Sequence, residues 1–534
     1  MPSNLTTLLN SYTNTLMNYS NPPPILLPAV YGLHLAAHGS RLTVSRILPL
    51  LAFLLFSGCA RRPNVLILTL DTTRADRLGC YGYALADTPG LDRLAAEGAL
   101  FERAQAVMPI TLPTHATIFT GYLPLEHGLR VNRDYALPPE IPTLASQFKQ
   151  AGYDTAAVVA SKVLDSKYGL SRGFDTYVDA PAEIKKRPAA EVSSLLLEWL
   201  EGRRRAPFFV WAHYFDPHMP RLPHPELSGL KSSDPYDIEI AYMDRQISRL
   251  LEYLDRQGLA RDTLVVAVAD HGEGLGEHGE ERHGHLIYQS TQHVPLILRW
   301  PGKIKPGRRI VGSVSQTDLM PTILELAGLP APRYGMGGLP KKPLLAASFA
   351  AALLKDTPFI SRPCHMEALW TYTHFNWSPL AGLVEGRWSY IFAPAPELYD
   401  LDADPAQRSD LVAAQPRRAD ELGMLLDGIE QKVEIQKPTE KVDVSPEEIR
   451  KFAALGYLAG RKDAVAQMPA RHSLTNLPDP KTKLQYYTRA EPPVLHGRFS
   501  CRQRPARGLP ADGGRISRKG AFHDPDRPRL PRAR

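Results

Sequence analysis

The chain has 534 residues, a hydrophobic content of 43% and a formal net charge of +7 at pH 7. This length allows more than one domain, and the composition is that of a globular protein. The positive charge does not indicate a nucleic-acid partner, because residues 489–534 contain 12 Lys/Arg and 4 Asp/Glu, a net of +8, and the other 488 residues sum to −1. Residues 489–534 are rich in Arg, Pro and Gly and have no apolar periodicity, which predicts a basic disordered tail.

A short apolar run near the N-terminus follows two arginines and ends before a Ser-Gly-Cys sequence. The run covers residues 47–56, and the cysteine is Cys59. About ten apolar residues are too few to span a bilayer, which takes ~20, but they suit the apolar region of a signal peptide. The pattern resembles a bacterial lipoprotein signal. We therefore expect residues 41–59 to direct export, with a lipid on Cys59 that leaves the protein periplasmic or peripherally attached to the membrane. Residues 1–40 show neither pattern and are expected to lie outside the fold.

From residue 61 to residue 335, short apolar runs alternate with amphipathic stretches, which indicates an α/β fold. Residues 64–70 are almost all apolar, as a buried parallel strand requires. Thr88-Pro89 then begins a short helix that Gly98 ends. Further strands are expected at 155–160, 207–212, 264–269 and 295–298, and helices at 113–119, 240–254 and 317–328. The prediction is a central, mostly parallel sheet flanked by helices.

After residue 335 the pattern changes to that of a smaller α+β subdomain. Strands are expected near 386–391 and 397–401, and a helix at 419–433 closes this part. We place the subdomain at residues 336–435. A charged linker is predicted at residues 436–488, with one short helical piece at 446–458.

Four sequence blocks carry side chains suited to chemistry: residues 62–82, 108–121, 269–273 and 294–297. Their order and content resemble the sulfatase family of the alkaline-phosphatase superfamily. In this resemblance Thr111 stands where sulfatases carry the cysteine that is oxidised to formylglycine, and His115 stands at the position of an arginine. The resemblance implies an alkaline-phosphatase/sulfatase-like α/β fold and a metal-dependent ester hydrolase.

The ends of two predicted strands carry candidate metal ligands. Asp71 follows the first strand, and Asp270-His271 follow a later one. In an open α/β sheet such ends meet at one edge, where ligands bind. A lone aspartate there commonly caps a helix, but two carboxylates and an imidazole together suit a divalent cation. We predict one ion (Ca, Mg, Mn or Zn) held by Asp71, Thr111, Asp270 and His271.

Thr111 is the predicted nucleophile. The Asp-His pair at 270–271 resembles the corresponding pair of phosphonate monoester hydrolases, nucleotide phosphodiesterases, phosphoethanolamine transferases and lipoteichoic-acid transferases. The phosphodiesterases and the two kinds of transferase use threonine as the nucleophile. A bound cation stabilises an alkoxide, and a helix N-terminus favours an anionic group. The alternative is that Thr111 only caps the helix at 113–119.

Histidines supply the remaining acid–base capacity, and each has a purely structural alternative. His283 is predicted to protonate the leaving group or to bind a second metal, with His285 as its substitute. His218, which follows the strand at 207–212, is expected on the same edge of the sheet. His115 is expected to orient Thr111 or to contact a substrate oxygen.

The sequence therefore favours an exported hydrolase of sulfate or phosphate esters that forms a covalent intermediate on Thr111. The substrate is expected to be a small-molecule, glycan or lipid ester. Two alternatives stay open: a phosphotransferase that modifies an envelope lipid or glycan, and a non-catalytic envelope scaffold. The intact set of Asp71, Thr111, Asp270 and His271 argues against the scaffold. No run of several membrane helices precedes the domain, which argues against the transferase.

Overall fold

The structure is a computed structural model that describes residues 62–484, except 182–185, 204–206, 336–340, 356, 439, 455–460 and 462–463. The predicted signal segment 41–59 with Cys59, residues 1–40 and the tail 489–534 lie outside the described residues, so export and lipidation stay predictions. Within the described residues, no helix combines the length and apolar character needed to cross a membrane.

A nine-stranded sheet forms the centre of the described fold, in the order β4-β3-β5-β1-β6-β8-β2-β7, with β9 paired to β2. The strands are β1 (Asn64–Leu70), β2 (Ala99–Gln105), β3 (Asp154–Val158), β4 (Thr176–Val178), β5 (Phe208–Tyr214), β6 (Thr263–Val268), β7 (His293–Val294), β8 (Leu296–Arg299) and β9 (Arg308–Ser315). From β4 to β6 every pairing is parallel. The sheet is mixed beyond that point, because β8 runs antiparallel to both β6 and β2.

The strands at the centre of the sheet are β1, β5 and β6, and every residue in them is buried. Both faces of these strands are covered, which is why they read as continuous apolar runs rather than as alternating ones. Each strand lies within two residues of its predicted position. The carboxyl ends of β5, β1 and β6 therefore lie side by side at one edge of the sheet.

Helices pack around the sheet in two groups of mutually contacting helices. One group contains α3 (Pro89–Glu97), α7 (Ala189–Gly202) and α8 (Pro235–Arg256), and the other contains α4 (Thr111–Thr120), α6 (Leu144–Gln150), α10 (Leu319–Leu326) and α11 (Ala350–Leu354). Asp234 caps the start of helix α8, where its side chain accepts a hydrogen bond from the Tyr236 amide, and Pro235 lies in the first turn. Its apolar stripe, predicted from the spacing of the apolar residues, is buried. The remaining short helices are α5 (Pro124–His127), α9 (Gln289–Gln292) and α12 (Trp370–Phe375).

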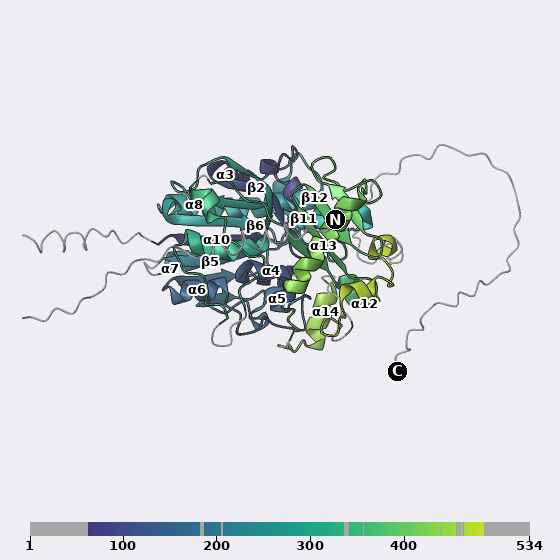
Figure 1. The fold of residues 1–534 in the computed structure, drawn as a ribbon. Helices are drawn as coiled ribbons and strands as arrows, with labels where there is room; N and C mark the ends of the chain where they lie inside the picture. Colours follow the sequence, from purple (N-terminus) through teal and green to yellow (C-terminus); the bar gives the residue numbers. More distant parts are fainter. Residues whose placement is uncertain are drawn as a thin grey trace, which may run out of the picture. The chain divides into compact units, whose positions relative to one another are not determined.

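A second, antiparallel sheet forms the smaller subdomain, at the right in Figure 1. Its strands are β10 (Cys364–Ala368), β11 (Leu380–Glu385), β12 (Trp388–Phe392) and β13 (Glu397–Asp400), and helix α13 (Pro416–Lys432) packs on it. Leu286 and Ile287 of the catalytic domain share a buried cluster with residues of these strands. Two separate apolar clusters thus involve this sheet, one with α13 and one with the catalytic domain.

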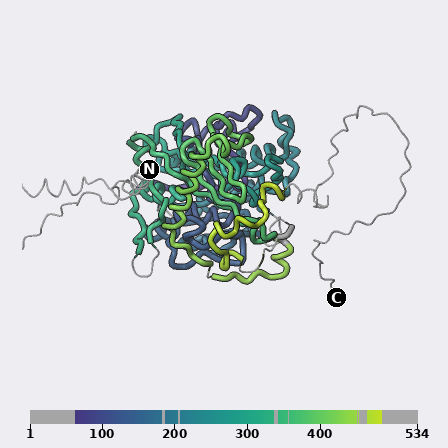
Figure 2. Tube along the Cα trace, turned by 45° about the vertical axis from the view of Figure 1, so that its right-hand side comes forward, coloured from purple at the N-terminus to yellow at the C-terminus, as the bar shows by residue number. Residues whose placement is uncertain are grey.

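Residues 436–484, predicted as a charged linker, contact the catalytic domain at several points. The Gln436 amide donates to the Leu125 carbonyl at 2.9 Å, and Tyr135 forms an isolated antiparallel bridge with Lys441. Helix α14 (Pro446–Ala454) is joined to the domain by a Lys167–Glu448 ion pair at 2.6 Å. Figure 2 shows this late segment, coloured yellow-green, running along earlier parts of the chain.

Candidate active site

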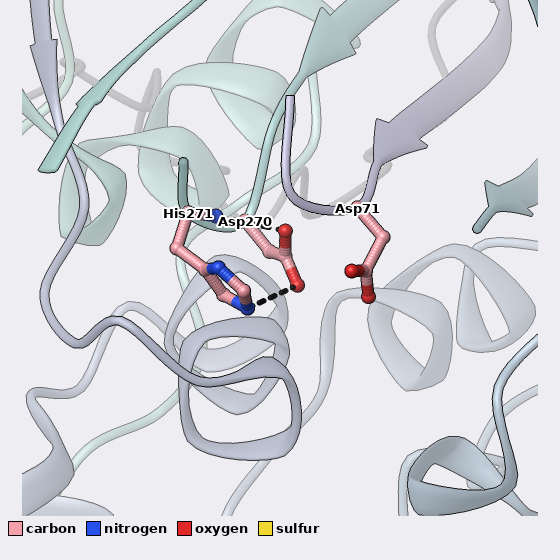
Figure 3. Close-up of side chains that lie close together, drawn as sticks. All are labelled: Asp71, Asp270 and His271. Carbon is pink, nitrogen blue, oxygen red and sulfur yellow. Dashed lines mark hydrogen bonds and ion pairs between the residues drawn. The ribbon is translucent and has the colours of Figure 1, made fainter. Parts of the chain in front are cut away.

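Three predicted ligands meet at the carboxyl ends of β1 and β6. Asp71 directly follows β1, and Asp270 and His271 come two and three residues after the last residue of β6. The two strands are parallel neighbours, so their ends lie at the same edge. One ligand atom from each residue lies within 4.8 Å of the others, and all three residues are buried. Figure 3 shows their side chains extending from the two strand ends toward a common region.

Thr111 joins this cluster from the first turn of α4. Its Oγ1 donates to Oδ2 of Asp71 at 3.3 Å and lies 3.5 Å from Nε2 of His271. The N-cap of α4 is Ile110, and the Leu112 amide is bound by the Asn132 side chain at 2.8 Å. The Thr111 hydroxyl therefore faces the acidic pair and does not cap the helix.

The hydrogen bonds of the cluster leave one ligand atom on each side chain. Oδ1 of Asp270 accepts hydrogen bonds from the backbone amides of His271, at 2.8 Å, and Thr72, at 3.1 Å. Nδ1 of His271 lies 2.9 Å from the Gly272 carbonyl, so it carries the proton and Nε2 keeps its lone pair. Oδ1 of Asp71 and Oδ2 of Asp270 are buried and have no hydrogen-bond partner among the described residues.

The two buried carboxyl groups of the cluster need a nearby positive charge to stay ionised. Burial raises the pKa of Asp71 well above its ordinary value, and the neighbouring Asp270 carboxylate raises it further. Burial also lowers the pKa of His271 and His115, which disfavours charged imidazoles. In the described part of the chain, no lysine or arginine forms an ion pair with Asp71 or Asp270. Two buried carboxylates without such partners fit a divalent cation.

His115 lies one helical turn after Thr111. Its Nδ1 is 2.8 Å from the carbonyl oxygen of Thr111 and 3.7 Å from Oδ2 of Asp270. Nε2 is buried and has no partner within the described chain. His115 therefore borders the cluster and is bonded to the backbone of Thr111 rather than to its hydroxyl.

Of two further predicted histidines, His283 lies beside His271 and His218 lies beside His283. The His283 ring centroid is 4.5 Å from that of His271, and the His218 ring centroid is 5.1 Å from that of His283. Nδ1 of His283 contacts Oε1 of Glu273 at 2.9 Å, and Nδ1 of His218 contacts the Met219 carbonyl at 2.6 Å. Burial lowers the pKa of His283 to about 4 and raises that of Glu273 to about 7.

His285, the predicted substitute for His283, is placed differently. Its Nδ1 lies 3.1 Å from Oε1 of Glu280, and its ring meets the edge of Trp370 at 4.3 Å between centroids. The structure thus brings His283 next to the cluster and directs His285 toward the smaller subdomain.

Sequence reasoning missed three side chains that support the cluster. His213 in β5 contacts Oδ2 of Asp71 at 3.3 Å. Glu273 binds His283, and Gln316 donates to the carbonyl oxygens of Ala269 and Asp270. Glu273 lies in the same sequence block as Asp270, which is a usable signal. His213 stands inside an apolar strand, where nothing in the local pattern distinguishes it from the core.

Comparison with known proteins identifies the family of this chain. A family model described as Sulfatase matches residues 63–329, half of the chain. The chain belongs to the sulfatase family. This membership makes it an ester hydrolase with a mixed α/β catalytic domain and a smaller C-terminal sheet, as predicted.

Characterised relatives and solved structures cover most of the chain. An N-acetylgalactosamine-6-O-sulfatase of Bacteroides thetaiotaomicron is 24% identical, over 72% of this chain and 99% of that protein. A protein solved in complex with its substrate D-glucosamine-2-N,6-O-disulfate has a TM-score of 0.59 at 21% identity, covering 71% of this chain and 99% of its own. The phosphonate monoester hydrolase of Agrobacterium radiobacter has a TM-score of 0.57 at 22% identity, covering 72% and 100%. These structures share the sulfatase fold with this chain.

Proposed function

We propose that this sulfatase-family hydrolase cleaves phosphate and sulfate esters through a covalent intermediate on Thr111, with one divalent cation held by Asp71, Thr111, Asp270 and His271. The observation that carries the proposal is the position of the Thr111 hydroxyl. It lies 3.3 Å from Asp71 and 3.5 Å from His271, beside two carboxylate oxygens with no partner among the described residues. A cation bound there would lower the cost of an alkoxide on Thr111 and stabilise negative charge on the transferred group.

In the proposed reaction Thr111 attacks the transferred group in line with the leaving oxygen. Its Oγ1 would form a bond to the phosphorus or sulfur atom while the bond to the ester oxygen breaks, and the hydroxyl proton has an acceptor in Asp71. The first turn of α4 provides a favourable dipole for the anionic group. Water would then attack the phosphorus or sulfur atom of the esterified Thr111. The bond to the threonine oxygen would break, and that oxygen would regain a proton.

His283 and His218 are the proposed groups for proton exchange with the leaving oxygen and with the attacking water. Glu273 occupies Nδ1 of His283, and the Met219 carbonyl occupies Nδ1 of His218. In His283 the remaining nitrogen is Nε2, which is the atom proposed for proton transfer. His115 is proposed to help hold the first turn of α4 through its bond to the Thr111 carbonyl.

The threonine favours phosphate over sulfate esters. Formylglycine enzymes release sulfate by collapse of a hemiacetal, a route that a threonine ester cannot follow. The Thr111 ester must be cleaved at the transferred group by water, which is easier for phosphoryl than for sulfuryl groups. The similarity to a phosphonate monoester hydrolase fold supports a site that accepts phosphoryl groups.

A metal titration combined with a substrate panel tests the proposal. Chelator-treated protein would be titrated with Ca²⁺, Mg²⁺, Mn²⁺ and Zn²⁺ and assayed on an aryl phosphate monoester, a phosphate diester and an aryl sulfate that share one leaving group. We expect one ion per chain, phosphate esters as the better substrates, and loss of both ion and turnover in Asp270→Asn. Asp255→Asn, on the surface of α8, is the matched control. An Asp270→Asn protein that keeps its ion, or an aryl sulfate preferred by a wide margin, would contradict the proposal.

A further inference from the structure

His213 is a fully buried histidine that joins three neighbouring strands at the edge where the cluster lies. It is the sixth residue of β5, which lies between β3 and β1 in the sheet. On one side its ring contacts the Ala160 amide, two residues after β3, and on the other it contacts Asp71, directly after β1. We propose that His213 is a positioning residue that determines which carboxylate oxygen of Asp71 is presented to the cation. This inference rests on the proposed cation site.

The hydrogen bonds define the tautomer of His213. The Ala160 amide donates to Nδ1 at 3.1 Å, so Nδ1 carries a lone pair and the ring proton is on Nε2. Nε2–H therefore donates to Oδ2 of Asp71 at 3.3 Å. A backbone amide cannot change its role as a donor, so this direction of the hydrogen bond is built into the fold.

The bond distinguishes the two oxygens of Asp71. Oδ2 accepts both the His213 ring proton and the Thr111 hydroxyl, whereas Oδ1 is buried without a partner among the described residues. With Oδ2 held, the carboxylate cannot exchange its oxygens without breaking two hydrogen bonds. Oδ1 is thereby kept in one place, and the Thr111 hydroxyl keeps a fixed acceptor.

Aromatic packing restrains the His213 ring. His115 meets it nearly edge-on at 5.0 Å between centroids, and the ring of Phe215, the residue after β5, lies 6.0 Å away. His213 is 0% exposed. A ring held in this way loses little further freedom when it bonds to Asp71, which is the condition for a support that orients a metal ligand.

The chain offers a matched control in His127, which is also 0% exposed. Its Nδ1 accepts the Leu129 amide at 3.1 Å, and its Nε2 lies 3.2 Å from Oγ1 of Thr117. The two histidines thus share burial, tautomer and the type of backbone bond. Only His213 contacts a proposed metal ligand.

The experiment measures Mn²⁺ affinity by calorimetry on chelator-treated full-length protein, together with kcat and KM on an aryl phosphate. His213→Met fills the ring volume without a donor, and we expect it to weaken Mn²⁺ binding by ~10–100-fold, the usual effect of removing such a support. His213→Gln has an N–H that can reach Asp71, and it should recover most of the affinity. His127→Met should bind Mn²⁺ like the wild type.

The outcomes separate this inference from the proposed function. If wild-type protein binds none of Ca²⁺, Mg²⁺, Mn²⁺ and Zn²⁺, both fail, and if it binds one of the others but not Mn²⁺, the variants are compared with that ion. If wild-type protein binds the ion and His213→Met binds it equally well, only the role of His213 fails, and the same holds if His127→Met loses as much affinity. Should His213→Met not fold, as judged by circular dichroism, the glutamine variant decides: near-wild-type binding supports the role, and a tenfold loss overturns it.

Discussion

At the residue scale, the chemistry depends on one hydroxyl whose direction is set by its neighbours. Thr111 is the first residue of α4, and Ile110 before it takes the N-cap position. Asn132 binds the Leu112 amide at 2.8 Å, so the start of the helix does not require the Thr111 side chain. The hydroxyl is thereby left for Asp71 and His271. This division of roles distinguishes a nucleophile from a capping residue of the same type.

Replacing Thr111 tests this assignment directly. Thr111→Ala should lower kcat by at least ~10²-fold, the scale of removing a nucleophile or its electrostatic support, while the fold and the bound ion are retained. Thr111→Ser should keep part of the activity, because the hydroxyl survives. Steady-state kinetics on an aryl phosphate, with metal content measured in parallel, provide the comparison. Normal turnover by the alanine variant would rule out a threonine nucleophile.

At the scale of elements, helix α13 is joined to strand β10 and to Arg471 by a partly buried network of charged side chains. Oε1 of Glu430 contacts Nε2 of His365 in β10 at 3.3 Å, and Oε2 accepts from Nε of Arg471 at 2.6 Å. Burial alone would raise the pKa of Glu430, but the bond to His365 and the Arg471 charge outweigh it and lower the pKa to about 2. The carboxylate is therefore more favourable in the folded state than in the unfolded chain.

This lowered pKa predicts a pH-dependent stability difference. Glu430 has an ordinary pKa of 4.5 and a folded pKa of about 2, so its stabilisation is fully present above pH 4.5 and is lost as the pH falls through 2. Glu430→Gln should cost ~2 kcal/mol of unfolding free energy at pH 7, and the difference from wild type should shrink below pH 4. Urea denaturation at several pH values measures it. Glu421→Gln, an exposed position on the same helix, should change stability by less than ~0.5 kcal/mol at any pH.

At the scale of the whole described chain, the catalytic domain and the smaller subdomain are joined next to the active site. Arg130 and Glu367 form a bidentate ion pair, in which Nε donates to Oε1 at 2.9 Å and Nη2 donates to Oε2 at 2.5 Å. Both side chains are almost fully buried. Glu367 lies in β10, and its amide donates to the carbonyl of Val107, a few residues before Thr111. The smaller subdomain therefore helps to hold the segment that leads into α4.

Breaking this pair from one side should be costly. Arg130→Met leaves the Glu367 carboxylate buried without its partner and should destabilise the protein by ~3–5 kcal/mol, whereas the double variant Arg130→Met/Glu367→Met should recover much of that loss. Chemical denaturation of the two single variants and the double variant gives the coupling energy. Additive single effects would show that the two side chains act independently.

Local patterns in the sequence were sufficient for the α/β fold and for the positions of β1, β5 and β6. An apolar run of strand length is a local property, and a polar residue directly after it must lie at the strand end. That is how Asp71, Asp270 and His271 could be predicted to meet. Strand β2 was missed because its sequence, Ala99–Gln105, mixes apolar and charged residues. Its partners in the sheet, β7, β8 and β9, come from about 200 residues later.

Only the tertiary structure decided how the candidate site is supported. The bonds from His213 to Asp71 and from Glu273 to His283, and the ion pair between Arg130 and Glu367, depend on side-chain directions. His213 and Asp71 are 142 residues apart, and their contact exists because β5 and β1 are neighbours in the sheet. The local sequence around each residue predicts its secondary structure and whether it is buried. It holds no information on which distant strand will lie beside it, because strand order is set by packing of the whole chain.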